Sequence, residues 1–496
     1  MRIIFQILSF ISISFLFVFL SFPFGYFDSF EKIFLTSPSL VLFAAISSLS
    51  VFLPHLLFAA VFMLAAFLFG RIFCGWICPF GAVMDFAAFI LKPFRKWKES
   101  EPSKRLLSKY ILLFVFAALS IFGLQIVWHF EPITIFARFF NLSLFPFLNA
   151  LLDKVFQYFI INHNIGAQLY SVISDNIFAA KQISFHYSLF FFLCFAIPLL
   201  LIVYKRRFWC RYICPLGAAL GILSFKSPFG LKSKPCLNSC GRCRDICPSN
   251  AMRTDGSFIK SECIMCMECY GLKCKKAIAE VLPSQKESAQ KVISRKQFLL
   301  WGAGIASALI VIGREKLSFF SAGRSSRINL LRPPGAVCNG NSFKQLCVRC
   351  GNCMKVCPTN ALQPAGLESG FDGIWTPKLD ASIGYCEYEC NACGPICPTQ
   401  AVRQMSLEDK KNFTIGKAEI QREICLPWSQ GIPCLVCEEM CPIPQKAIEF
   451  LPETIKGVRI DVPFVKRELC IGCSICQNKC PVEGINKGID VKAIFS

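Results

Sequence analysis

The sequence lacks the residue patterns of most catalytic sites. It has no nucleophile beside a general base, no glycine-rich loop suited to a phosphate and no evident pair of catalytic carboxylates. Gly302 and Gly304 fall in an apolar run, where small residues favour helix packing. We therefore expect no substrate chemistry beyond oxidation and reduction.

Acidic residues are also scarce, with 32 Asp and Glu against 53 Lys and Arg and a net charge of +21. Such a charge can indicate nucleic-acid binding. However, segment 71–109 holds 8 basic and 3 acidic residues, and segment 205–296 holds 18 and 6, so these two stretches carry most of the excess. Basic charge confined to loops between apolar runs is the positive-inside pattern of membrane proteins. We expect a membrane partner and no nucleic acid.

Apolar residues make up 54% of the 496 residues, which is too many for a wholly soluble chain. Four runs approach the roughly 20 residues that a helix needs to cross a bilayer. They lie at about 3–23, 50–70, 110–128 and 188–204. Residues 1–230 are therefore predicted to form an α-helical integral membrane domain with a cytoplasmic N-terminus and with loop 129–187 outside. Within that loop, segment 132–180 is amphipathic and aromatic, and it is either a helix on the outer membrane surface or an ordinary packed subdomain.

A fifth apolar run covers residues 294–313. Its start, Ser294 to Leu299, resembles a twin-arginine export signal with Lys296 in place of the second arginine. A plain signal anchor is the alternative. Both interpretations place the C-terminal segment 314–496 outside the cytoplasm.

Four C-terminal cysteine runs, within a predicted domain at 330–496, each end in Cys-x2-Cys-x3-Cys-Pro. They are Cys347, Cys350, Cys353, Cys357; Cys386, Cys390, Cys393, Cys397; Cys425, Cys434, Cys437, Cys441; and Cys470, Cys473, Cys476, Cys480. In bacterial ferredoxins three such cysteines ligate one [4Fe–4S] cluster and the fourth ligates a partner cluster. Zinc would favour separated cysteine pairs, and disulfides are typical of small secreted domains. The motifs should therefore pair, either consecutively or in a nested order of first with fourth and second with third.

A cytoplasmic segment, 231–285, has two further runs and is predicted to be a two-cluster ferredoxin. The first is Cys236, Cys240, Cys243, Cys247, and the second is Cys263, Cys266, Cys269, Cys274. The exchange of fourth ligands would join Cys274 to the first three and Cys247 to the second three. The total is six [4Fe–4S] clusters.

A duplicated motif supplies four more cysteines at the cytoplasmic ends of two predicted spans. The sequences are Phe73-Cys-Gly-Trp-Ile-Cys-Pro79 and Trp209-Cys-Arg-Tyr-Ile-Cys-Pro215. Cys74, Cys78, Cys210 and Cys214 could hold an additional metal, act as redox thiols or line a cofactor, or they could be buried thiols of a repeated turn. Cys194 and Cys338 are interpreted as structural.

These motifs resemble two known families. Residues 1–280 resemble the NapH/MauN-type membrane ferredoxins in their four spans, twin Cys-x3-Cys-Pro motifs and two-cluster segment. Residues 294–496 resemble the NapG/MauM-type four-cluster ferredoxins in the export-like segment, the Leu331–Ala336 stretch and the Cys347–Gly351 stretch. The chain would be a fusion of the two. The resemblance implies a bacterial inner-membrane protein that takes electrons from the quinol pool and passes them to a periplasmic redox enzyme or cytochrome.

Polar groups near the outer ends of the predicted spans are candidates for a quinone site, because quinol oxidation needs a proton acceptor. They are His55, His129, Glu131 and His186. Each could instead be an interfacial side chain. The histidines could also ligate a b-type haem, an alternative that an optical spectrum would test.

The predicted fold is therefore an α-helical membrane domain joined to α+β ferredoxin-like domains of the bacterial two-cluster type. The predicted role is electron transfer, with quinol oxidation as the one reaction the chain could itself catalyse. A maturation factor for a periplasmic redox enzyme and a cluster-bearing structural subunit are the alternatives.

Overall fold

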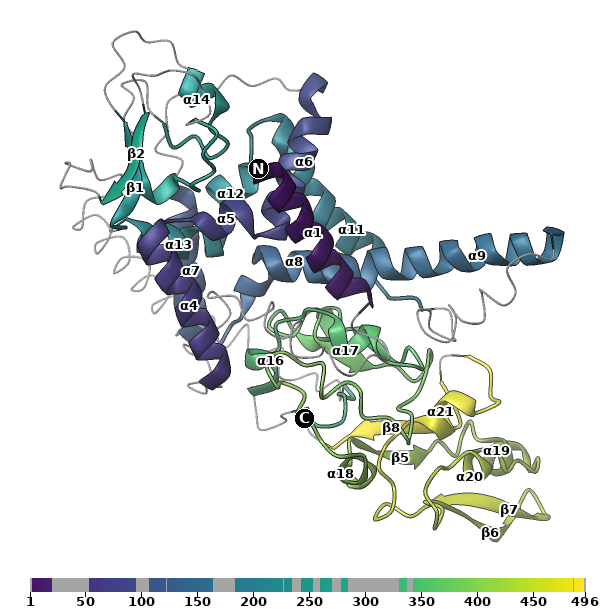
Figure 1. Ribbon diagram of the computed structural model, residues 1–496. Helices are drawn as coiled ribbons and strands as arrows, with labels where there is room; N and C mark the ends of the chain where they lie inside the picture. The colour runs from purple at the N-terminus through teal and green to yellow at the C-terminus, as the bar shows by residue number, and fades with distance from the viewer. Residues whose placement is uncertain are drawn as a thin grey trace. The chain divides into compact units, whose positions relative to one another are not determined.

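The computed structural model describes residues 2–19, 53–94, 107–121, 123–163, 183–225, 227–233, 242–252, 259–269, 278–283, 330–336, 342–484 and 486–494. The chain divides into two compact units (Figure 1). Unit 1 comprises Met1–Val18, Ser29–Phe140 and Leu189–Phe319. Unit 2 comprises Phe19–Asp28, Asn141–Ser188 and Phe320–Ser496. The predicted fifth span, 294–313, lies outside the described residues.

Unit 1 is built mainly from apolar helices. They are α1 (Arg2–Phe19), α4 (Leu53–Phe69), α5 (Ile72–Trp76), α6 (Pro79–Ile90), α7 (Ser108–Ile121), α8 (Pro132–Phe139), α11 (Ser188–Leu200), α12 (Phe208–Tyr212) and α13 (Pro215–Ser224), with 3-10 turns η1 (Lys92–Phe94), η3 (Ile126–His129) and η5 (Leu201–Val203). Proline opens α6, α8 and α13, where its fixed φ suits the first helical position and its missing N–H costs nothing. Helix α13 lies against α4 and α7.

The membrane assignment of unit 1 stays a prediction. Among the described residues, only the run Pro132–Asn162 has the length and apolar composition to cross a membrane. It comprises α8, a π-helical segment η4 (Phe140–Leu144) and α9 (Phe145–His163). The predicted spans contain shorter apolar helices, α1, α4, α7 and α11. Residues Pro132–Arg138 of α8 are buried, as expected of a packed segment rather than a surface one.

The ferredoxin-like part of unit 1 is a two-stranded sheet with the cysteine loops between its strands. Strand β1 (Phe229–Ser233) pairs antiparallel with β2 (Ile278–Pro283), with Ser233 opposite Ile278 (Figure 1). A short helix α14 (Arg242–Ile246) and a 3-10 turn η6 (Lys260–Glu262) lie between them in the chain. Turn η6 contacts α13 of the helical part.

Unit 2 combines small antiparallel sheets with short helices. The strands pair as β3 (Leu362–Pro364) with β4 (Pro377–Leu379), β5 (Gly416–Ile420) with β8 (Ile489–Ala493), and β6 (Ile448–Ile455) with β7 (Val458–Val465). The helices are α16 (Ser342–Leu346), α17 (Asn352–Lys355), α18 (Leu407–Asn412), α19 (Leu426–Gln430), α20 (Val436–Glu439) and α21 (Ile475–Lys479), with one 3-10 turn η7 (Leu367–Ser369). The β6–β7 hairpin turns at Lys456 and Gly457, both with positive φ, as a two-residue hairpin turn requires.

Candidate iron-sulfur sites

The motif cysteines of unit 2 gather into four groups of four. Group A is Cys347, Cys350, Cys353 and Cys397; group B is Cys357, Cys386, Cys390 and Cys393; group C is Cys425, Cys434, Cys437 and Cys480; group D is Cys441, Cys470, Cys473 and Cys476. In every group three cysteines come from one motif and one comes from its neighbour in the chain. This is the arrangement that consecutive pairing predicts, and nested pairing would have grouped them differently.

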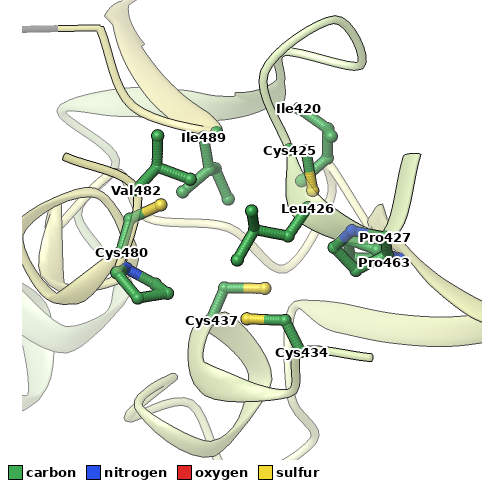
Figure 2. A pocket seen from close by; sticks show the side chains of 12 residues that line it. Ile420, Cys425, Leu426, Pro427, Cys434, Cys437, Pro463, Cys480, Val482 and Ile489 are labelled. Carbon is green, nitrogen blue, oxygen red and sulfur yellow. The ribbon is translucent and has the colours of Figure 1, made fainter. Parts of the chain in front are cut away.

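Groups B, C and D each line a cavity. The three cavities are similar in size and are partly open to the surroundings. Figure 2 shows group C, in which Cys434 and Cys437 lie together while Cys425 and Cys480 enter from other sides. Apolar side chains such as Leu426 and Ile489 close the space between them. An apolar shell of this kind is one of the features that set a cluster's potential.

The backbone of the cysteine loops has a repeated left-handed pattern. Positive φ angles occur two and four residues after the first cysteine of three motifs, at Arg349 and Gly351, Gly472 and Ser474, and Met265 and Met267. Such alternation turns successive N–H groups toward one side, which makes the anion-binding concavities typical of Fe–S sites. The three loops are therefore shaped for the same kind of ligand.

Backbone N–H groups also donate to the sulfurs of the last cysteine of two motifs and of the first cysteine of a third. Val402 N–H donates to Cys397 Sγ at 3.4 Å, Ala251 N–H to Cys247 Sγ at 3.3 Å, and Ala418 N–H to Cys470 Sγ at 3.4 Å. Hydrogen bonds to the sulfurs are a main determinant of cluster potential.

The donor chemistry fits iron-sulfur clusters better than the alternatives. A zinc ion would need its sulfurs to converge at about 2.3 Å from one point. Among the described residues, no three His, Cys, Asp or Glu side chains are arranged to hold a single metal ion. The described cysteines are all free thiols, so none of them forms a disulfide. A cubane, in which each thiolate binds a different iron, suits four cysteines that surround a larger space.

Burial favours the neutral thiols in the absence of metal. It raises the pKa of Cys386 to about 11 and that of Cys437 to about 12, in both cases with the added repulsion of neighbouring cysteines. Thiolates are the ligands, so cluster binding must displace these protons.

Three lysines beside groups C and D were missed by the sequence analysis. Lys417 Nζ donates to Cys470 O at 2.7 Å and Lys446 Nζ donates to Cys441 O at 3.0 Å, both in group D. Lys487 Nζ approaches Cys480 O of group C at 3.4 Å. Positive charge near a cluster favours its reduced form. These lysines could not be predicted from the sequence, because none of them belongs to the cysteine motif and only the tertiary structure brings them to the cysteines.

In unit 1 the structure describes one complete cysteine group of the two-cluster segment. Group E comprises Cys247, Cys263, Cys266 and Cys269. It combines the second motif with the last cysteine of the first, as the predicted exchange requires. Cys243 packs against Cys269 and Cys247. The remaining predicted ligands Cys236, Cys240 and Cys274 lie outside the described residues, as does Cys338.

The duplicated motif forms a further cluster of thiols, group F, consisting of Cys74, Cys78, Cys210 and Cys214. The two copies have the same backbone, because Cys78 and Cys214 are both N-caps with φ near −60° and ψ near 115°. Cys78 N–H donates to Phe73 O at 2.9 Å and Cys214 N–H to Trp209 O at 3.0 Å. The repeat in sequence is therefore a repeat in structure.

Buried ion pairs next to group F were also missed. Arg71 Nη1 contacts Glu262 Oε2 at 3.0 Å, and Arg207 Nη2 contacts Asp85 Oδ2 at 2.7 Å. Lys109 and Arg2 add a second cation to Glu262 and Asp85 respectively. The sequence held a signal for the arginines, because Arg71 and Arg207 both stand three residues before the first cysteine of their motif.

The candidate quinone groups are divided between the two units, and their role stays a prediction. The Glu131 carboxylate is buried and caps α8 by accepting from Thr134 N–H at 2.7 Å. His129 Nδ1 lies 3.1 Å from Ile126 O in the same unit. His186 belongs to unit 2, where its ring lies 3.7 Å from Asp380 and is half exposed. The side chain of His55 lies outside the described residues.

Comparisons with known proteins agree with the cysteine geometry. A family model described as "4Fe-4S binding domain" matches residues 51–98 and 186–232, which include both copies of the duplicated motif, and a second model with that description matches residues 343–363. The ferredoxin-type protein NapG of Escherichia coli is 34% identical over 205 residues, covering 40% of this chain and 85% of NapG.

Two further relatives extend the likeness. The methylamine utilization ferredoxin-type protein MauM of Methylorubrum extorquens is 32% identical over 189 residues, covering 38% of this chain and 84% of MauM. A putative electron transport protein of Escherichia coli, YccM, is 26% identical over 272 residues, or 53% of this chain and 64% of YccM. No solved structure matches the chain.

The cysteine groups and these matches define an iron-sulfur electron-transfer protein with several ferredoxin-type domains. The chain belongs to the NapG/MauM family of ferredoxin-type proteins, which accounts for about two fifths of its length. The predicted ferredoxin-type fold and multi-domain organisation are confirmed.

Proposed function

We propose that this chain is a membrane-bound relay that passes electrons from the quinol pool to a periplasmic redox enzyme. It would join a NapH/MauN-type membrane ferredoxin to the NapG/MauM-type domain in one polypeptide. Six [4Fe–4S] clusters, held by groups A to E and by the set Cys236, Cys240, Cys243 and Cys274, would supply one-electron chemistry.

One contact in unit 2 carries the relay interpretation. Cys386 N–H of group B donates to Cys473 O of group D at 2.9 Å, and this bond joins the two motif pairs. Group A adjoins B through Cys353 and Cys393, and D adjoins C through Cys476 and Cys437. The four groups thus form one unbranched series in the order A, B, D, C. Clusters that neighbour one another in such a series would pass electrons from one to the next, and a purely structural role does not require this order.

Exposed apolar side chains support a membrane location for unit 1. Ile3 on α1 is 67% exposed, Val61 on α4 is 64% exposed and Leu189 on α11 is 72% exposed. Large apolar side chains exposed on three helices can mark a surface that contacts a membrane. Helices that satisfy their own backbone hydrogen bonds can present it to lipid instead.

The chain segments that make up unit 2 support the proposed topology. The loop predicted to lie outside, within Asn141–Ser188, folds in one unit with the C-terminal segment. Asn141 Nδ2 donates to Cys350 O at 3.1 Å, and Asn360 Nδ2 donates to Ser184 O at 2.7 Å. Segments that fold together lie on the same side of a membrane. A periplasmic loop 129–187 therefore requires a periplasmic domain 330–496.

The experiment that tests the proposal is anaerobic reduction by quinol of membranes that contain the full chain. We expect a short-chain quinol to bleach the iron-sulfur absorption, and iron analysis to give about 24 irons per chain from six cubanes. Cys476→Ala removes a ligand of group D and should interrupt the series. The clusters on the side of group D away from the electron donor should then stay oxidised, while Cys194→Ala should behave as wild type.

Two results would redirect the proposal. Bleaching by dithionite without any bleaching by quinol would remove the quinol pool as donor. A deletion strain whose periplasmic enzyme lacks its cofactor, although electrons still reach it, would favour the maturation role.

A further inference from the structure

We propose that Lys410 is a buried counter-ion of group B, which stabilises an added electron on the cluster at the crossing between the two motif pairs of unit 2. This inference rests on the proposed relay function and extends it, because it names a side chain that sets where the electron rests. Lys410 is a positioning residue, since it acts on the cluster through the ligand Cys386 and does not itself bind iron.

The side chain of Lys410 is buried, and only 2% of the residue's surface is exposed. Helix α18 fixes its position, because Lys410 N–H donates to Ser406 O at 3.0 Å and the N-cap hydroxyl of Ser406 accepts from Asp409 N–H at 3.0 Å. Lysines are almost never buried without a partner, because it costs free energy to remove an ammonium group from water. We therefore looked for the anion that balances this one.

Backbone carbonyls receive the ammonium group of Lys410, but no carboxylate does. Its Nζ donates to Glu387 O and, at 2.9 Å, to Tyr388 O. Among the residues that the structure describes, no Asp or Glu side chain forms an ion pair with Lys410, whereas the neighbouring Lys411 pairs with Glu389 at 2.6 Å. The charge of Lys410 is therefore left for a different anion to balance.

The cysteine next to these carbonyls supplies that anion. Cys386 directly precedes Glu387 in the chain and belongs to group B. Burial raises the pKa of the Cys386 thiol to about 11, and the charge of Lys410 and a hydrogen bond from it act in the opposite direction. Lys410 thus favours the thiolate, which is the form that ligates iron. Each electron added to the cluster adds negative charge, so a buried cation beside a ligand stabilises the reduced form more than the oxidised form.

Lys410 lies at the point where the two motif pairs meet. Cys386 N–H donates to Cys473 O of group D at 2.9 Å, and Lys410 binds the two residues that follow Cys386. An electron that moves between the pairs therefore passes by way of group B. This transfer leaves the donor cluster oxidised by one electron and the group B cluster reduced by one, with no proton moved. Lys410 favours the reduced state and so holds the electron at the crossing.

Other basic side chains near the cysteine groups are placed differently. Lys417 and Lys446 are partly exposed, so water screens their charge. Arg349 is buried beside group A, but it donates to Asp372 O at 2.6 Å and is within electrostatic reach of the Asp372 carboxylate. Its charge is therefore partly balanced by protein. We expect the effect on a cluster potential to be larger for Lys410 than for any of these residues.

The test is a redox titration followed by EPR on anaerobically purified full-length protein in detergent. Lys410→Gln removes the charge and keeps an N–H donor, Lys410→Arg keeps the charge, and Lys411→Gln is the matched control at the neighbouring, partly exposed lysine. We expect Lys410→Gln to weaken the reduced form of one cluster about tenfold, which lowers its midpoint potential by about 59 mV for one electron. Lys410→Arg and Lys411→Gln should titrate as wild type.

Removal of a group B ligand identifies the cluster that responds. In a Cys390→Ala chain, we expect the addition of Lys410→Gln to leave the titration of the remaining clusters unchanged. A shift that persists in this background would assign the effect to another cluster and overturn the proposal. The titration uses a chemical reductant, so its result can be read even if quinol does not reduce the chain.

Unchanged potentials in Lys410→Gln at wild-type iron content would also overturn the proposal. So would equal shifts in Lys410→Gln and Lys411→Gln, because they would reflect net charge and not one buried group. If Lys410→Gln does not accumulate, Lys410→Met replaces it, and its potentials have the same meaning. Loss of about four irons from both neutral variants, with full iron in Lys410→Arg, would make Lys410 a structural bridge and contradict its effect on the potential.

Discussion

Asp85 shows how a single carboxylate can hold two segments of unit 1 together. Its Oδ1 accepts from Arg207 Nε at 2.9 Å, and Arg2 from the first helix binds the same side chain. Burial opposes the charged carboxylate, but Arg207, with Arg2 and Arg206, outweighs burial and lowers the pKa of Asp85 to about 2. The ionised form therefore stabilises the folded chain.

We predict that Asp85→Asn lowers the stability of unit 1 by about 2 kcal/mol at pH 7, the equivalent of a pKa lowered by almost two units. The folded pKa lies below the unfolded one, so this contribution is fully present above pH 4 and is lost as the pH falls toward 2. The difference in thermal midpoint between variant and wild type should be constant from pH 5 to pH 8. Asp461→Asn, at an exposed position of β7, is the control. A difference that changes across this range would contradict the assignment.

The cysteine motifs of unit 2 work as pairs of elements, because each loop completes its neighbour's site. Cys397 ends the second motif yet belongs to group A, and Cys357 ends the first yet belongs to group B. The β3–β4 strand pair lies in the chain between the two motifs, after Cys357 and before Cys386. The two motifs of a pair are therefore expected to lose cluster-binding capacity together when the turn between them is disrupted.

Double variants can measure this exchange directly in the full chain. We predict that Cys347→Ala/Cys397→Ala loses one cluster, or about four irons, because both residues serve group A. Cys386→Ala/Cys397→Ala should lose two clusters, or about eight irons, because its residues serve groups B and A. Equal losses of about eight irons from both variants, which nested pairing predicts, would contradict consecutive pairing.

Much of this element-level organisation is predictable from spacing alone. The first three cysteines of a ferredoxin motif ligate one cluster and the fourth ligates its partner, so the ligand sets of groups A to D could be named in advance, apart from the choice between consecutive and nested pairing. That choice depends on which loops pack together, as do the positions of Lys417 and Lys446. Glu262 and Asp85 were unpredictable because their partners lie more than 80 residues away in the chain. The sequence does contain a signal for Arg71 and Arg207, because each stands three residues before the first cysteine of its motif copy.

On the scale of the whole molecule, the exposed apolar helices of unit 1 predict a requirement for lipid. The full chain should remain in the membrane fraction after alkaline carbonate washing. We further predict that Leu193→Lys, at an exposed position on α11, lowers the membrane-inserted yield, because a lysine near the bilayer centre costs about 3 kcal/mol.

The same substitution on a water-facing surface provides the control. Val458→Lys is at an exposed position of β7 in unit 2 and should change stability by less than about 0.5 kcal/mol. If both lysine variants behave alike and carbonate releases the chain, unit 1 does not lie in a bilayer.

The exchange of the fourth cysteine also sets the timing of biosynthesis. A ribosome that has just made Cys357 has supplied only three of the four thiols of group A, and Cys397 follows about 40 residues later. At 5–20 residues per second this delay is on the order of 2–8 s. During that interval the nascent chain carries three unligated thiols that oxygen could oxidise or a copper ion could bind. A scaffold protein that delivers iron-sulfur clusters should therefore have to wait until Cys397 is made, or shield the first motif until then.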